Sequence, residues 1–272
     1  MKRSAAVAAL LLGFSVVAGS APAFADTSIT IAGSTALLPL VKDAAGSYQQ
    51  AHPEVKISVS GGGSGTGIND VASKAADIGD SDILAPSHPE LHDNRVAVIG
   101  FAIVTNPSVG VKNLSKSQLQ DIFSGKATNW KQVGGPDAKI VVINRPRSSG
   151  TRAVFTKTIM GSATISESGL TEDATGTVVS VVKQTPGAIS YAAFSGTHTS
   201  GLTEVSVDGV APTDANIITG KYPIWSYEHM FTMGAPAGEV AKFIEFVAGN
   251  ADLVRKDGFI LIRDMKVSET DR

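Results

Sequence analysis

Short segments rich in isoleucine and valine alternate with helical segments along most of this chain, and this alternation restricts the fold more than any other feature. The clearest strand–helix pairs are residues 29–31 with a helix ending near Gln50, residues 56–60 with a helix ending near Ala75, and residues 139–143 with a helix over 153–160. Such alternation is typical of α/β proteins. We therefore expect mainly parallel sheets flanked by helices, with the apolar run 96–104 crossing between domains.

Three of the turns that join a strand to a helix share one composition. They combine glycine with hydroxyl residues, at Gly33-Ser34-Thr35, Gly63-Ser64-Gly65-Thr66 and Ser148-Ser149-Gly150-Thr151. Glycine lets the backbone approach a ligand closely, and the first N–H groups of a helix attract anions. A single turn of this kind is usually a helix cap. Because all three follow strands, where ligands of open α/β sheets bind, they predict one shared anion site.

Three arginines surround the third turn, namely Arg145, Arg147 and Arg152. A fixed guanidinium beside a helix N-terminus would strengthen an anion site. The motif alone leaves open which of the three supplies it. Arg152 falls inside the expected helix, so we expect it to face solvent.

The N-terminus has the pattern of a cleaved signal peptide over residues 1–25. Lys2 and Arg3 precede an apolar run over 5–17, and Ala23-Phe24-Ala25 is a small-x-small cleavage site. The chain has no cysteine, which excludes disulfides and a lipid-modified cysteine. These features predict a soluble periplasmic or secreted protein.

Charge limits the partners of this protein. Without Lys2 and Arg3, 21 basic residues face 25 acidic ones, a formal charge of −4. This balance argues against nucleic acid and anionic membranes as partners. His88 and His92 have a spacing that could bind a metal on a helix, but their polar surroundings favour an exposed turn. We expect no metal and no other cofactor, and a monomer.

The glycine-rich segment 61–67 does not match the common phosphate loops or hydrolase motifs. It lacks the Gly-Lys-Ser/Thr ending of a Walker A loop and does not fit G-x-G-x-x-G. Thr66 replaces the last glycine of a G-x-S-x-G elbow around Ser64. A hydrolase with Ser64 or Ser149 as nucleophile would need a nearby base or metal, and neither motif contains histidine.

Several motifs together resemble the phosphate-binding proteins of ABC-type phosphate importers. They are Ala32-Gly33-Ser34-Thr35, the segment 61–67, Asp77-Ile78-Gly79-Asp80-Ser81-Asp82, the segment 114–125, Thr128-Asn129-Trp130, the segment 145–151 and the closing helix 243–247. The resemblance implies a two-lobed fold of the type II periplasmic-binding-protein family, with the ligand in a cleft between the lobes. Lobe one would comprise residues 26–100 and 222–272, and lobe two residues 101–221.

The resemblance also implies a set of phosphate contacts. Carried over position by position, they are Thr35, Ser64, Asp82, Arg145, Ser149, Gly150 and Thr151, with Ser34, Gly65 and Thr66 as further donors. Asp82 would be the acceptor, although Asp80 lies on the same face of an extended segment and is not separated from it by the residues alone. Family members commonly carry an acidic residue two positions after the site arginine, where this chain has Arg147. What holds Arg145 in place is therefore left open.

The function implied is capture of inorganic phosphate and its delivery to a membrane permease, without enzymatic activity. Because the contacts divide between two lobes, phosphate should favour a closed form. Three alternatives remain: a binding protein for another oxyanion such as sulfate or molybdate, a secreted phosphoester hydrolase, and an exported adhesion or signalling protein.

Overall fold

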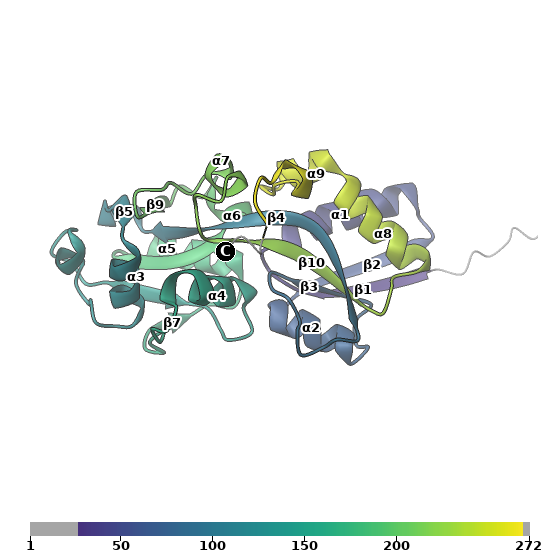
Figure 1. The fold of residues 1–272 in the computed structure, drawn as a ribbon, viewed down its shortest axis with the longest axis horizontal. Helices are drawn as coiled ribbons and strands as arrows, with labels where there is room; N and C mark the ends of the chain where they lie inside the picture. Colours follow the sequence, from purple (N-terminus) through teal and green to yellow (C-terminus); the bar gives the residue numbers. More distant parts are fainter. Residues whose placement is uncertain (1–26, 269–272) are drawn as a thin grey trace, which may run out of the picture.

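Ten strands and nine α-helices lie between residues 27 and 268, the part of the chain that the computed structural model describes. The predicted signal peptide and the last four residues lie outside this part. The elements form two groups side by side, joined by two long strands (Figure 1). No helix among the described residues is long and apolar enough to cross a membrane.

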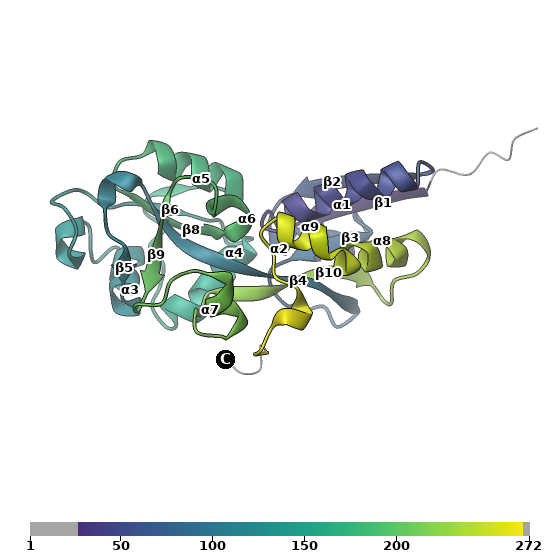
Figure 2. The same ribbon diagram turned by 90° about the horizontal axis from the view of Figure 1, so that it is seen from above.

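The first group, called the first lobe, is built on a sheet with the strand order β2-β1-β3-β10-β4. The strands are β1 (Thr27–Gly33), β2 (Val55–Gly61), β3 (Ile78–Ser81), β4 (Leu91–Thr105) and β10 (Trp225–Met233). Its helices are α1 (Leu38–Ala51), α2 (Ser64–Ala72), α8 (Gly238–Gly249) and α9 (Ala251–Lys256). Helix α2 covers one face of the sheet, and α1 and α8 cover the other (Figures 1 and 2).

The second group, called the second lobe, continues from the far half of β4. Its strands are β5 (Asn113–Leu114), β6 (Val141–Asn144), β7 (Leu170–Thr171), β8 (Ala188–Ala193) and β9 (Thr203–Val207). Its α-helices are α3 (Lys116–Phe123), α4 (Gly150–Phe155), α5 (Thr175–Gln184), α6 (Phe194–Thr197) and α7 (Asp214–Ile218). Short 3-10 helices cover Pro107–Val109, Trp130–Val133 and Ile262–Asp264, and a π-helical turn covers Thr156–Met160.

Strand β4 links the two lobes. It pairs with β10 up to Gly100 and with β8 from Phe101 onward, so the predicted crossing run 96–104 lies inside it. The pairs β1–β2, β1–β3, β6–β8, β6–β7 and β5–β9 are parallel, whereas every antiparallel pair involves β4 or β10. The α/β fold is thus mixed rather than uniformly parallel, because the two connecting strands run back through it. The boundaries predicted for the two lobes, and their movement as separate bodies, stay a prediction.

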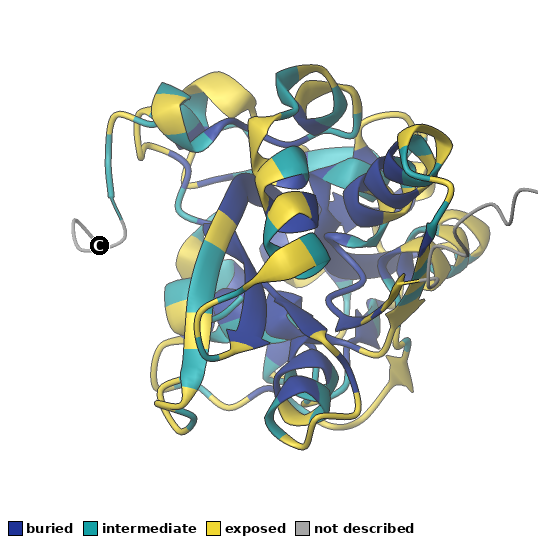
Figure 3. Ribbon diagram, turned by 90° about the vertical axis from the view of Figure 1, so that its right-hand side faces the viewer, coloured by how far each residue is buried: buried dark blue, intermediate teal, exposed yellow. Residues whose placement is uncertain are grey.

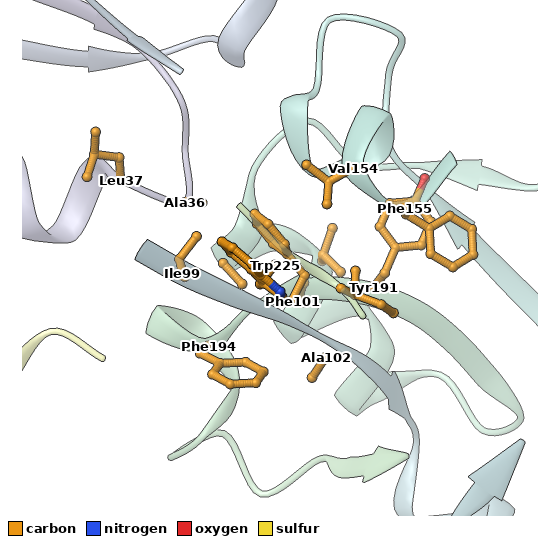
Figure 4. Close-up of a cluster of buried hydrophobic side chains, with 14 of the residues drawn as sticks. Ala36, Leu37, Ile99, Phe101, Ala102, Val154, Phe155, Tyr191, Phe194 and Trp225 are labelled. Carbon is orange, nitrogen blue, oxygen red and sulfur yellow. The ribbon is translucent and has the colours of Figure 1, made fainter. Parts of the chain in front are cut away.

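The hydrophobic core runs through both lobes as one cluster. Buried strands occupy the centre, and the surrounding helices expose only their outer faces (Figure 3). Where the lobes meet, Trp225 and Phe101 lie between Leu37 and Ile99 on one side and Tyr191 and Phe155 on the other (Figure 4). Trp225 and Tyr227 are buried strand residues of β10.

The predicted strands and helices are present, with shifted ends. Helix α4 begins at Gly150 rather than near Ala153, because the Ser149 side chain accepts a hydrogen bond from the Arg152 amide and caps the helix there. Thr151 and Arg152 therefore lie in its first turn. The remaining predicted helical segment, Thr156–Met160, adopts the π-helical turn.

Candidate functional site

The site lies where three strand-to-helix turns meet. The turn after β1 carries Ser34 and Thr35, the turn after β2 leads into α2 at Ser64, and the turn after β6 leads into α4 at Gly150. The first two belong to the first lobe and the third to the second lobe. The side chains of Ser34, Thr35, Ser64, Ser149 and Thr151 are all buried.

Asp82, just after β3, connects all three turns. Its carboxylate accepts hydrogen bonds from the Ser34 hydroxyl and from the Thr151 hydroxyl, the latter at 2.9 Å. Its backbone amide donates to Ser64 Oγ at 2.9 Å. Asp82 is only 2% exposed. The acidic side chain in contact with both lobes is therefore Asp82, and the carboxyl oxygens of Asp80 have no hydrogen-bond partner among the described residues.

Ser34 also stabilises the turn that leads into helix α1. Its hydroxyl oxygen accepts hydrogen bonds from the amides of Ala36 and Leu37, at 3.0 and 3.2 Å. Because its only proton is donated to Asp82, this hydroxyl has no proton left for an anion. In this arrangement Ser34 holds Asp82 in place.

Arg145 supplies the buried cation, with a side chain 1% exposed. Its Nε donates to the carbonyl of Glu172 at 3.0 Å, and its Nη2 donates to the carbonyl of Asp173 at 3.0 Å and to Thr35 Oγ1 at 3.1 Å. Its Nη1 is buried and has no partner among the described residues. Two backbone carbonyls thus orient the guanidinium without an acidic side chain, and both N–H groups of Nη1 are available to an anion.

Three other hydroxyls of the site accept hydrogen bonds from N–H groups. Thr35 Oγ1 accepts from Arg145 and from the Thr175 amide at 3.3 Å. Ser64 Oγ and Ser149 Oγ each accept from a backbone amide. A hydroxyl that accepts a hydrogen bond still has its proton to give. The protons of Thr35, Ser64 and Ser149 can therefore complement Arg145.

Gly150 lets the two lobes approach each other closely. A Cβ atom at this position would lie 2.1 Å from Ser64 Oγ and 2.9 Å from Asp82 Cβ. Contacts this short do not occur, so any side chain here would force the lobes apart. The glycine is thus required by the distance between the lobes.

Gly65 and Thr66 lie at the edge of this arrangement. The Gly65 amide donates to the carbonyl of Ser148 at 2.9 Å, which joins the lobes. The Thr66 hydroxyl donates to the Gly62 carbonyl at 2.8 Å inside its own lobe. The proton of the Gly65 amide and that of the Thr66 hydroxyl are therefore already donated within the protein.

The expectation that Arg152 faces solvent is wrong. Its side chain is 11% exposed, and Nη1 donates to the backbone carbonyl of Arg145 at 2.7 Å. It also forms an ion pair with Glu167 at 2.9 Å. The earlier start of α4 explains the difference, since Arg152 lies in the first turn and can reach back toward Arg145. Arg147, by contrast, is 85% exposed and pairs with the same glutamate.

Burial shifts the ionisation of the charged groups in opposite directions. Desolvation raises the pKa of Asp82, while the hydrogen bonds from Ser34 and Thr151 and the charge of Arg145 oppose the rise. Desolvation lowers the pKa of Arg145, and Asp82 opposes this. Asp82 is thus the main compensation for Arg145, whereas the hydrogen bonds from Ser34 and Thr151 compensate Asp82 more than the charge of Arg145 does. Among the described residues, no group of three or more histidine, cysteine or acidic side chains could hold a metal ion.

The sequence interpretation missed several residues around this site. They are Glu172 and Asp173, whose backbone carbonyls accept from Arg145, Thr175, whose amide donates to Thr35, and the buried acid Glu228. The first three act through the backbone, which carries no side-chain signal. Glu228 had a signal, because a charged residue inside the apolar strand Trp225–Met233 is unusual.

Comparisons with known proteins agree with this geometry. Residues 18–251 match the model of the PBP superfamily domain. A phosphate-binding protein PstS of Bacillus subtilis is 43% identical over 90% of this chain and 84% of its own length. The PstS protein of Borreliella burgdorferi is 28% identical over 86% of this chain and 90% of its own.

Solved structures give the same result. A crystal structure with bound phosphate, of a substrate-binding protein assigned to a phosphate ABC transporter of Clostridium perfringens, superposes with a TM-score of 0.81. It is 29% identical, and the match covers 87% of this chain and all of that one. An ABC-type phosphate transport receptor of Vibrio cholerae, also 29% identical, has a TM-score of 0.67 over 86% of this chain and 99% of its own. These relatives are binding and transport proteins, and with 43% identity over nine-tenths of its length this chain belongs to the PBP superfamily and, within it, to the family of the PstS phosphate-binding proteins.

Proposed function

We propose that this protein captures inorganic phosphate between its lobes and delivers it to the permease of an ABC importer. The observation that carries the proposal is Arg145 Nη1, a buried cationic donor without a partner among the described residues. It lies in a site that also holds the carboxylate of Asp82 and the spare protons of Thr35, Ser64 and Ser149. A donor set with one acceptor suits an oxyanion that carries a proton.

Asp82 favours phosphate over sulfate and molybdate. At neutral pH phosphate keeps at least one proton and can donate it to Asp82, whereas sulfate has none. Sulfate would meet an ionised carboxylate in a site shielded from water. One unsatisfied buried acceptor costs about 1–3 kcal/mol, which corresponds to a preference of roughly a hundredfold at the upper part of this range.

The test is calorimetry of the phosphate-free protein with phosphate, sulfate and molybdate at pH 7 and matched ionic strength. We expect selective phosphate binding by the wild type and a marked loss of selectivity in Asp82→Asn. Asp77→Asn, which changes an acidic residue whose carboxylate accepts from the Thr30 amide, is the matched control. Equal binding of sulfate by the wild type would contradict the phosphate assignment. Unchanged selectivity in Asp82→Asn would move the acceptor role to Asp80.

Hydrolysis of phosphoesters is the alternative that the serines raise. Ser64 and Ser149 accept hydrogen bonds from the amides of Asp82 and Arg152, and none of the five histidines forms a hydrogen bond with either serine. A serine nucleophile needs a base to remove its proton. We therefore propose a binding protein without enzymatic activity. Release of a chromogenic alcohol from a phosphomonoester at a rate that Ser64→Ala or Ser149→Ala abolishes would contradict this.

The remaining proposals concern location and assembly. The predicted signal peptide supports an exported, soluble protein, and the negative balance of charge supports a function without nucleic acid. We propose that the protein acts as a monomer, because the site is formed by one chain. Light scattering of the mature chain at micromolar concentration would test this.

A further inference from the structure

Two more carboxyl groups are buried beside Asp82. In the antiparallel pair β3–β10, His229 faces Ser81 and Met230 faces Asp80. One step further along this register, Glu228 lies opposite Asp82. Opposite residues of an antiparallel pair point to the same face, and alternate residues of a strand do so too. Asp80, Asp82 and Glu228 therefore share one face of the sheet, the face opposite to Ser81 and His229.

Glu228 has no donor to satisfy it. The residue is fully buried, and neither of its carboxyl oxygens accepts a hydrogen bond from any described residue. The register of β3 and β10 places the carboxyl group of Asp82 beside that of Glu228. Asp82 is itself an acceptor, already bonded by Ser34 and Thr151. Two carboxyl groups can share a hydrogen bond only if one of them carries a proton.

The charges around Glu228 favour a proton on it. The acidic groups of β3, Asp82 and Asp80, face it, and across β4 the residue opposite is Ala97. The side chain of His229 is directed to the other face, where it pairs with Asp93. Burial, and then the charges of Asp82 and Asp80, raise the pKa of Glu228 well above its usual range. The nearest cation of the site, Arg145, acts on Asp82 instead.

Between the two acids, Asp82 is the one suited to carry the negative charge. It receives hydrogen bonds from Ser34 and Thr151 and the attraction of Arg145. Glu228 receives none of these. When like charges share a buried site, the environment decides which group ionises.

We propose that Glu228 is a positioning residue of the phosphate site, which stays protonated and donates its proton to Asp82. The inference rests on the proposed function, since it deepens the role of Asp82 as acceptor. The bond from Glu228 keeps Asp82 ionised and fixes one lone pair, so that another is directed at the proton of phosphate. With Asp80 and Glu228 neutral, the charges of Asp82 and Arg145 cancel. With all three acids ionised, the site would oppose an anion by two negative charges.

Two substitutions separate the donated proton from simple packing. Glu228→Leu removes the donor but fills the buried space, a change that buried charged groups often tolerate. Glu228→Gln keeps a neutral donor of the same length. Met230→Leu, one position further along the same face and fully buried, is the matched control for repacking. The readout is the ratio of phosphate to sulfate affinity at pH 7, measured by calorimetry.

We expect Glu228→Leu to lower the phosphate-to-sulfate ratio by about tenfold, the effect of one lost charge-assisted hydrogen bond. Glu228→Gln should restore the ratio to within about threefold of the wild type, and Met230→Leu should leave it unchanged. If Glu228→Leu keeps the wild-type ratio, or if Glu228→Gln loses it as fully as Glu228→Leu, the proposal is wrong.

Infrared spectroscopy tests the proton itself, and a wild-type spectrum without the band of a protonated carboxylic acid contradicts the proposal even if a variant does not fold. The wild type at pH 7 should show the carbonyl stretch of a protonated carboxylic acid, and Glu228→Gln should lose part of this band. A band that the substitution leaves unchanged would contradict the proposal. This measurement needs no phosphate. If calorimetry finds no phosphate binding in the wild type but the band is lost in Glu228→Gln, the proposed function fails while the protonated Glu228 stands.

Discussion

The first lobe brings three buried carboxyl groups to the site, and the second lobe brings one buried guanidinium. Asp80, Asp82 and Glu228 lie together, and no basic side chain of their own lobe is bonded to them within the part of the chain that the structure describes. Arg145 is held by the carbonyls of Glu172 and Asp173, which are neutral. The charged group that opposes Asp82 is thus in the other lobe.

This difference indicates that charge is compensated between the lobes rather than within them. A buried ion without an opposite charge is costly, so two lobes that each carry one have a reason to close on each other. Phosphate, which offers both acceptors for Arg145 and a proton for Asp82, would join the two halves. Ligand capture and lobe closure would then be the same event.

The largest effect should come from keeping the two halves apart. In Gly150→Ala the new Cβ would meet Ser64 Oγ at 2.1 Å, which prevents the present contact between the lobes. We expect phosphate affinity to fall by at least a hundredfold, about 2.7 kcal/mol, because interlobe bonds such as Thr151 to Asp82 are lost together. Calorimetry measures the affinity, and small-angle scattering should show that phosphate no longer reduces the radius of gyration.

Gly46→Ala is the control for this substitution. Gly46 lies in helix α1, is exposed, and a Cβ there would meet nothing within 4 Å. It should bind phosphate like the wild type and contract on binding. A wild type whose radius of gyration stays constant at saturating phosphate would argue for a rigid site and against charge compensation by closure.

A smaller effect on phosphate affinity should follow from replacing Arg145, the cation of the second lobe. Lysine in place of Arg145 cannot bond to Glu172, Asp173 and Thr35 while presenting two N–H groups to an anion. We expect Arg145→Lys to weaken phosphate binding by more than tenfold, about 1.4 kcal/mol or more. Arg147→Lys should change it little, because that side chain is 85% exposed. Loss of binding in Arg147→Lys with none in Arg145→Lys would place the cation elsewhere.

Arg152 should fall between these two arginines. It does not reach the site, but it bonds to the backbone carbonyl of Arg145. Arg152→Ala should lower phosphate affinity by about threefold to tenfold through a less well held Arg145. An effect larger than that of Arg145→Lys would show that Arg152 itself meets the anion.

The smallest effect should come from Asp80 in the first lobe, and it concerns the stability of the folded protein. Burial, and then the charge of Asp82, raise the pKa of Asp80 well above its usual range. In the unfolded chain this carboxyl loses its proton above about pH 4, whereas the folded protein retains it. The contribution of protonated Asp80 to the stability of the folded protein is therefore complete below about pH 4. It is lost as the pH rises toward the pKa of Asp80 in the folded protein.

Asp80→Asn should remove this loss. We expect the variant to be more stable than the wild type at pH 7, with the difference in melting temperature shrinking to zero near pH 3. Thermal unfolding across this pH range measures it. A difference independent of pH would mean that Asp80 is not protonated in the folded protein.

Much of the fold could be read from local patterns. Alternating apolar strands and helices predicted the α/β class, and the run 96–104 predicted a strand shared by both lobes because it is apolar on both faces. The helix start at Gly150 was missed, because the apolar residues of this helix begin only at Ala153 and the polar first turn before them carries no apolar pattern. The antiparallel direction of β10 was also not visible, since strand direction depends on long-range connections.

The site divides in the same way. Sequence motifs predicted the turns with Ser34, Thr35, Ser64 and the segment 149–151, since glycine and hydroxyl residues before a helix have a local physical meaning. What holds Arg145 could not be predicted, because a backbone carbonyl has the same chemistry in every residue.

The sequence by itself determined the class of fold, the helix N-termini of the site and the presence of one arginine and an acidic pair beside them. Only the tertiary structure decided which acid meets the second lobe, how Arg145 is held and that Glu228 joins the acidic group. The physical reason is that backbone contacts and the pKa of a buried acid depend on neighbours distant in the chain. Asp82 and Glu228 are separated by 145 positions, and only the pairing of β3 with β10 brings them together.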